Sequence, residues 1–430
     1  MIGSGIFIVS AESARVTGSA GWLITAWVVS GCMTLVASVC CAELAAMLPR
    51  AGGQYVFFRE AYGRPAGFLF GWTMLLVVQT GTIAAVAVAF ARFLGVLVPG
   101  ISTKNVLLSA GPVQLSTAQA VAAVVVLGLT ASNATGLKAG KWTQNVFTAA
   151  KLLALVALTV AGLALGAGKP ELSFDSEAGS GAGMLAVLAV AMVGPLFSQS
   201  AWNNVTFAGE EIRDPGRTLP RALLYGCVLV TTVYVLANLA YLSVLSFEQV
   251  KAAPEDRVAT FMMTSLFGDG AARLMAVAIM VSTFGCVNGL ILSGARVSFA
   301  MARDGLFFEG LARVNRASVP SNALWAQAAW AVVLVLSGSY SELLRYVIAV
   351  DVLFFALVVA AVLVLRRKMP TADRPFRAPA AGLLVIVYCA VALALMAVLV
   401  VERPATSLPG YGIVLAGLPV FFLWARRSKA

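Results

Sequence analysis

Histidine is absent from this 430-residue chain, and charged residues make up only 11% of it. Soluble domains carry about a quarter charged residues, because their surface faces water. A chain that is 60% hydrophobic cannot cover a water-facing surface in that way. The composition therefore excludes an ordinary soluble protein.

The lack of histidine and the scarcity of cysteine also restrict the chemistry. The six cysteines form no CxxC pair and all lie in or near apolar runs, where we interpret them as packing residues. We expect no metal, no cofactor and no catalytic residues, which argues against a membrane enzyme. No cysteine lies in an expected outer loop, so we expect no obligate disulfide-linked accessory subunit.

Apolar runs recur along the whole chain, and each is long enough for a hydrocarbon core of ~30 Å. They do not alternate as barrel strands would, so the sequence predicts a helical bundle in the lipid bilayer. We expect spans at 22–48, 66–98, 118–135, 143–166, 183–208, 219–245, 270–300, 322–337, 342–365, 382–401 and 409–425. Residues 3–18 resemble a twelfth span whose first half-helix is missing. No signal peptide and no domain boundary are visible, so we expect residues 1–430 to form one transmembrane domain.

The net charge of +11 fits a membrane protein better than a nucleic-acid-binding protein, because no soluble segment is long enough to hold a nucleic-acid module. When the loop after 22–48 is placed in the cytoplasm, most loop arginines and lysines fall inside. This orientation predicts a multi-pass protein of the cytoplasmic membrane with both termini of the intact chain inside.

Two segments interrupt the apolar helical pattern. The first is Gly3-Ser4-Gly5, where glycines at membrane depth free backbone N–H groups and the helix start suits a carboxylate. The second lies in 194–204, where carbonyl groups after the upstream half-helix suit an ammonium group. Interrupted spans at matching positions of two five-span halves indicate an inverted repeat with a midplane site. Close helix packing at the glycines is the alternative.

Several charged residues lie inside or at the ends of spans. Lys151 lies within an apolar run, where a lysine is costly and usually faces the bundle interior; snorkelling to the interface is the alternative. We expect Glu43 to pair with a basic loop residue in a structural role. Glu210 and Glu211 either close the cytoplasmic side through Arg213 or Arg217 or are solvated.

The same residues carry a resemblance to the amino acid–polyamine–organocation superfamily, and most of all to the L-type amino acid transporters and their bacterial relatives. The matching stretches are Ile2-Gly3-Ser4-Gly5-Ile6-Phe7, Ala42-Glu43-Leu44, Pro49–Tyr55, Gln144–Leu153, Trp202-Asn203-Asn204, Glu210-Glu211 and Arg217–Pro220. The resemblance covers nearly the whole chain. It implies an all-α fold with a 5+5 inverted repeat, 1–166 and 183–365, followed by two further helices in 382–425.

The resemblance also implies roles for individual residues. The substrate carboxylate would bind the backbone of Ile2, Ser4, Gly5 and Ile6, and the ammonium group the carbonyls near Phe197, Ser198 and Ser200. Phe197 matches the family's aromatic lid and Asn203 a polar helper. Lys151 matches the lysine that replaces sodium, which implies sodium-independent transport. The chain departs from its relatives after Phe197, where Ser200 and Ala201 should narrow the pocket and favour small or polar neutral amino acids.

The sequence thus predicts a sodium-independent exchanger or permease for amino acids that works by alternating access. One alternative is a proton-coupled amino acid or polyamine symporter, in which Lys151 would be the proton site. The interrupted segments contain no acidic residue of the kind a polyamine would require. A second alternative is a receptor or subunit that binds amino acids without transporting them.

Overall fold

The computed structural model describes residues 2–110, 113–136, 140–166, 168, 171–175, 181–337 and 340–427. Most of these residues are helical, and ten helices are long and apolar enough to cross a membrane. The chain is therefore a multi-pass helical membrane protein, as its composition predicts.

The bounds of the elements follow the apolar runs closely. In chain order they are α1 (Gly5–Thr17), α2 (Ala20–Met47), α3 (Gln54–Tyr62), α4 (Arg64–Thr73), η1 (Met74–Val78), α5 (Gln79–Leu97), β1 (Val106–Ala110), β2 (Val113–Ser116), α6 (Thr117–Ala134), α7 (Gly140–Leu165), α8 (Ala182–Ala191), α9 (Val193–Gln199), η2 (Ser200–Phe207), η3 (Gly209–Glu211), α10 (Pro215–Val244), α11 (Phe247–Lys251), η4 (Pro254–Asp256), α12 (Val258–Phe267), α13 (Asp269–Arg303), η5 (Glu309–Ala312), α14 (Ser321–Ser337), α15 (Tyr340–Lys368), α16 (Ala381–Glu402) and α17 (Pro404–Arg427).

Each of the eleven expected apolar spans coincides with one helix or a run of consecutive helices. Ten of them meet the length and hydropathy of a membrane span, whereas α14 is a shorter apolar helix. The partial first span corresponds to α1, which has 13 residues and begins at Gly5. The count of twelve spans and the 5+5 inverted repeat stay predictions.

Two connecting segments contain short elements that the apolar pattern does not predict. The membrane-spanning part is helical, and the segment before α6 pairs as an antiparallel hairpin in which Leu108 lies opposite Leu115. The stretch 246–269 folds into α11, η4 and α12. A capping box at Ser246 and Gln249 starts α11, with each side chain bonded to the other residue's backbone N–H. These short elements satisfy backbone groups locally, which periodicity over long apolar runs does not predict.

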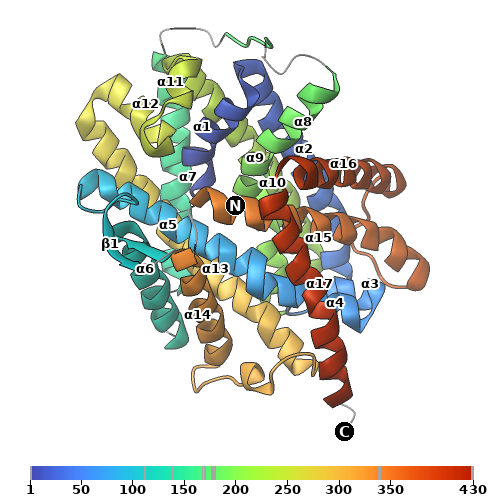
Figure 1. The fold of residues 1–430 in the computed structure, drawn as a ribbon. Coiled ribbons are helices and arrows are strands. Elements are labelled where there is room, and N and C mark those ends of the chain that lie inside the picture. The colour runs from blue at the N-terminus through green and yellow to red at the C-terminus, as the bar shows by residue number, and fades with distance from the viewer. Residues whose placement is uncertain are drawn as a thin grey trace.

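The long helices pack around α1 and α9, which lie next to each other in the interior (Figure 1). Helix α2 packs along α10, and α5 packs along α13. Close approach depends on small residues: a side chain at Gly31 of α2 would overlap Thr231 of α10. The first residues of the chain lie in the middle of the bundle rather than at its edge (Figure 1). The arrangement buries the two segments that the sequence marks as interrupted.

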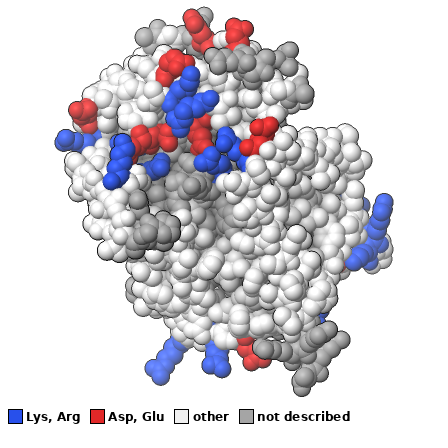
Figure 2. Space-filling view, viewed as in Figure 1, with Lys and Arg blue, Asp and Glu red and all other residues white. Residues whose placement is uncertain are grey.

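Charged side chains are unevenly distributed over the surface. On the face shown in Figure 2 they gather across the upper part of the molecule and along its edges, with a broad uncharged surface between. Large exposed apolar residues such as Leu153, Leu185 and Leu274 are between 67% and 71% exposed. Exposed leucines on membrane-length helices are expected where the helices face lipid, because lipid tails are as apolar as leucine.

Candidate functional site

The first interrupted segment ends where α1 begins. Ile2, Ser4, Gly5 and Ile6 are all buried, and Ser4 precedes the helix without forming a side-chain cap. The N–H of Phe7 donates to the carbonyl of Ser4 at 3.1 Å, which closes the first turn. The first N–H groups of a helix have no partner within that helix. The start of α1 therefore points backbone donors into the protein interior.

The second interrupted segment is a change of helix type. Helix α9 is α-helical to Gln199, and Ser200–Phe207 then continue as a 3₁₀ helix. The chain makes a further 3₁₀ turn at Gly209–Glu211, and a regular α-helix returns only at Pro215. A 3₁₀ stretch within a membrane helix changes which carbonyl groups are left free.

The serine hydroxyls of this segment bond back to its own carbonyls. Ser198 Oγ donates to the carbonyl of Gly194 at 2.9 Å, and Ser200 Oγ donates to the carbonyl of Phe197 at 3.0 Å. Tyr234 of α10 donates to the carbonyl of Ser198 at 3.4 Å. The carbonyl of Phe197 therefore accepts from both the N–H and the Oγ of Ser200, whereas the carbonyl of Ser198 accepts from Tyr234.

The two interrupted segments touch at Gly5 and Ser198. A side chain at Gly5 would overlap Ser198 Oγ and approach its Cα to 2.9 Å. A second contact of this kind lies one turn further along α1, where a side chain at Gly194 would overlap Val9. Ser13 of α1 donates to the carbonyl of Ala191 at 3.0 Å. Helix α1 is therefore fixed against α8 and α9 along its length, and a donor-bearing helix start lies beside a carbonyl-bearing helix end.

The other predicted site residues lie around this contact. Phe197 and Ser200 are buried, and Asn203 Nδ2 donates to Gln54 Oε1 of α3 at 2.8 Å. Asn203 therefore connects the 3₁₀ segment to α3.

Lys151 lies on α7 with 8% of its surface exposed. Within the described part of the chain it forms no hydrogen bond or ion pair. One turn earlier, Phe147 packs on Phe284 and Gly285 of α13, and the next residue, Cys286, lies against Gly3. Lys151 is thus on a helix that reaches the first interrupted segment through α13.

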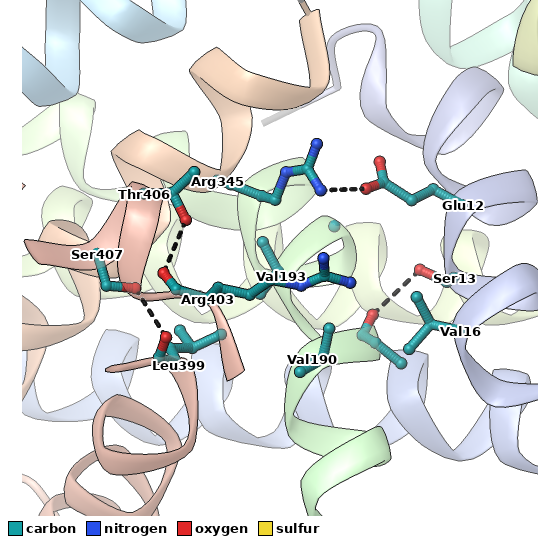
Figure 3. A pocket seen from close by; sticks show the side chains of 12 residues that line it. Glu12, Ser13, Val16, Val190, Val193, Arg345, Leu399, Arg403, Thr406 and Ser407 are labelled. Atoms are coloured by element: carbon teal, nitrogen blue, oxygen red, sulfur yellow. Dashed lines mark hydrogen bonds and ion pairs between the residues drawn. The ribbon is translucent and has the colours of Figure 1, made fainter. Parts of the chain in front are cut away.

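On one side of the α1–α9 contact, a small cavity separates α1 and α8 from α15, α16 and α17. It has a volume of ≈ 20 Å³ available to water centres, enough for about one water molecule. Glu12 of α1 pairs with Arg345 of α15 at 3.7 Å, and Arg403 extends toward α1 from the α16–α17 connection (Figure 3). Glu12 was not among the residues predicted from the sequence. The one feature that could have indicated it is an acidic residue in the second half of a short apolar helix.

On the opposite side, the connection between α2 and α3 closes against the 3₁₀ segment. The N–H of Gly52 donates to the carbonyl of Phe207 at 3.0 Å, and Ala51 forms an antiparallel bridge with Ala208. Arg296 of α13 contacts Glu211 at 2.7 and 2.9 Å, and Arg303 lies 3.6 Å from Glu210. Arg213 and Arg217 were therefore the wrong expected partners, because α13 passes closer to both acids than the arginines next in sequence.

Glu43 has the structural role expected of it. Arg366 donates to both of its carboxylate oxygens, at 2.9 and 2.7 Å, and the N–H of Ala378 donates at 2.8 Å. Arg374 lies 3.5 Å away. A buried carboxylate with this many donors links α2 to α15 and the following loop.

The whole chain matches a family of known membrane proteins: residues 1–418 fit the model of the amino acid permeases. The chain belongs to the amino acid permease family. The resemblance read from the interrupted segments is thereby confirmed.

Named relatives of this permease are mammalian amino acid transporters. The human large neutral amino acids transporter small subunit 2 is 31% identical, with 100% of this chain and 79% of the relative aligned. The mouse Asc-type amino acid transporter 1 is 30% identical over 100% of this chain and 80% of the relative. The human b(0,+)-type amino acid transporter 1 is 27% identical over 99% and 85%.

The first of these names describes a small subunit, and therefore a component of a larger transporter. Our expectation that this permease has no obligate disulfide-linked accessory subunit conflicts with that relationship. That expectation rested on the cysteine positions, which indicate only where a disulfide could form. Subunits can also associate through non-covalent surfaces.

Proposed function

We propose that this permease exchanges or conducts neutral L-amino acids across the cytoplasmic membrane, independently of sodium, by alternating access. The observation that carries the proposal is the contact between Gly5 and Ser198. It sets backbone donors at one interrupted helix beside backbone acceptors at another. An α-amino acid carries a carboxylate and an ammonium group on one carbon, and needs both kinds of group close together.

In this proposal the carboxylate binds backbone N–H groups of Ile2, Ser4, Gly5 and Ile6. The ammonium group binds the carbonyls near Phe197, Ser198 and Ser200. Phe197 covers the bound substrate, and Asn203 holds the 3₁₀ segment through Gln54. Because Gly5 and Ser198 touch, this conformation is closed, and substrate entry requires the two segments to separate.

Lys151 supplies the positive charge that a sodium ion would otherwise provide. Its burial and its lack of an ionic partner among the described residues support that role. A charged lysine within a membrane protein is retained where its charge is used.

The transport cycle proposed here alternates between two barriers. The Glu12–Arg345 pair lies on one side of the site, and the Gly52–Phe207 contact with its ion pairs lies on the other. With both termini placed in the cytoplasm, the first pair faces outward and the second contact faces inward. The twelve-span count with a 5+5 inverted repeat and two further helices, α16 and α17, completes the proposed architecture.

The test is uptake of labelled neutral amino acids into proteoliposomes in sodium-free buffer, with and without unlabelled amino acid inside. Uptake that requires preloading supports a sodium-independent exchanger, and uptake without preloading supports a permease. Uptake only with sodium or a proton gradient would replace the proposal with a coupled symporter. Binding without flux would identify a receptor or subunit.

A further inference from the structure

Asp351 is an acidic residue in the middle of α15 that the proposed function does not use. It lies within a long apolar run, and only 3% of its surface is exposed. Removing a carboxylate from water is costly unless a cation or hydrogen-bond donor replaces the water. An ionisable residue at membrane depth is accordingly retained where it meets a partner.

The position of Asp351 on α15 places it toward the protein interior. One turn before it, Val347 lies against Gly81 of α5, and one turn after it, Phe355 packs on Trp202 with ring centroids 5.2 Å apart. Residues four apart lie on one face of a helix. Asp351 lies between Val347 and Phe355 along α15, and Tyr388 of α16 is close enough to interact with its carboxylate electrostatically. Helix α15 also packs against α9, which carries Phe197 and Ser198.

Asp351 has no cationic partner of its own. No hydrogen bond or ion pair to its carboxylate exists within the described part of the chain. Among the arginines of α15, Arg345 pairs with Glu12 and Arg366 pairs with Glu43. Lys151 is the one buried lysine among the described residues, and it makes no ion pair with Asp351.

Glu43 provides the comparison. Among the described residues Glu43 and Asp351 are the two buried acids, and Glu43 receives three hydrogen bonds from Arg366 and Ala378. The fold therefore supplies donors to one buried carboxylate and leaves the other without any. Hydrogen-bond donors for this carboxylate can therefore come from a ligand.

We propose that Asp351 is an anionic subsite for the substrate side chain and extends the substrate range to amino acids whose side chain ends in a cation. The inference rests on the proposed function, because the carboxylate and ammonium group of such a substrate occupy the Gly5–Ser198 site. Its side chain extends toward α15, where a terminal ammonium or guanidinium group donates to the carboxylate of Asp351. Charge-assisted hydrogen bonds of this kind are the strong ones.

The experiment compares ornithine with glutamine, a neutral amino acid of similar length, in proteoliposome exchange. We expect the protein to exchange both. Asp351→Asn keeps the shape and removes the charge, and it should lower kcat/KM for ornithine at least about tenfold while glutamine changes by less than about threefold. Asp351→Glu, which keeps the charge, should retain ornithine exchange. Elution of each variant as a single species on size-exclusion chromatography shows that it folds.

Two results would overturn the subsite. One is a ratio of kcat/KM for ornithine to kcat/KM for glutamine that is the same in the wild-type protein and in Asp351→Asn. This holds even if the variant loses a response of exchange to a pH gradient. The other is exchange of glutamine without any exchange of ornithine. Thermal unfolding in detergent separates this inference from the transport proposal. If ornithine raises the Tm of the wild-type protein and not of Asp351→Asn, the subsite stands even where no flux is measured; if it raises neither, the subsite falls.

Discussion

The backbone of Gly5 lies directly against the side chain of Ser198, and the two residues come from helices separated by most of the first half of the chain. Each lies where its helix is interrupted, at the start of α1 and near the end of α9. The contact is possible only because Gly5 has no Cβ. The geometry of the proposed amino acid site therefore depends on one missing side chain.

Gly5→Ala should abolish most amino acid exchange without unfolding the protein. The added methyl group overlaps Ser198 and forces α1 and α9 apart. Exchange measured in proteoliposomes should fall at least about tenfold, because an error of about 1 Å at a binding site costs up to 100-fold. Gly226→Ala on α10, which has open space around it, is the matched control and should leave exchange unchanged.

Adding Ser198→Gly to Gly5→Ala should restore part of the activity, because it removes the Oγ and Cβ that the new methyl group meets. A double variant no more active than Gly5→Ala would show that the contact itself is not the cause of the loss.

Lys151→Met should remove sodium-independent exchange while preserving the fold. Methionine fills a similar volume, so the change isolates the loss of the ammonium group. We expect exchange in sodium-free buffer to fall at least about tenfold, measured as initial rate of labelled substrate entry. Lys104→Met, at an exposed lysine, should have no effect. Unchanged exchange in Lys151→Met would mean that Lys151 has a packing role.

Glu43→Gln should destabilise the protein more than any loss of a surface ion pair. It removes the charge that Arg366 and Arg374 share in a buried setting. Breaking a buried pair on one side costs about 3–5 kcal/mol, whereas exposed pairs contribute about 0.2–1 kcal/mol. Thermal unfolding in detergent should show a large fall in Tm for Glu43→Gln and almost none for Glu248→Gln, whose partner Lys251 lies on the surface. Equal shifts in the two variants would contradict the structural role of Glu43.

Reversing the charge of Arg296 should weaken the barrier formed by the 3₁₀ segment and α13. Arg296 makes a two-point contact with Glu211, and Arg296→Glu replaces attraction with repulsion. We expect the exchange rate to change at least about threefold, since like charges in contact disfavour one state of the cycle. The double variant Arg296→Glu with Glu211→Arg should return toward the wild-type rate. A double variant that behaves like Arg296→Glu alone would exclude this pair from the barrier.

Much of the fold could be predicted because a bilayer permits few structures. Long apolar runs must become helices, and every expected span coincides with one. Glycines before α1 and polar residues after Phe197 likewise marked the two interruptions. The hairpin at Val106–Ser116 and the helices α11 and α12 were missed, because short polar segments lie in water and are not under the same constraint.

The sequence by itself determined that this is a helical membrane protein, since composition and apolar run length leave no other way to satisfy the backbone in lipid. Its resemblance to the amino acid permeases came separately, from the motifs at the interrupted segments. Tertiary structure alone decided which distant residues meet. It brought Gly5 to Ser198, paired Glu211 with Arg296 rather than with a neighbouring arginine, and buried Asp351 without a cationic partner among the described residues. Such pairings depend on how helices rotate and cross, and a hydrophobic pattern along one helix carries little information about the partner that its polar residue will face.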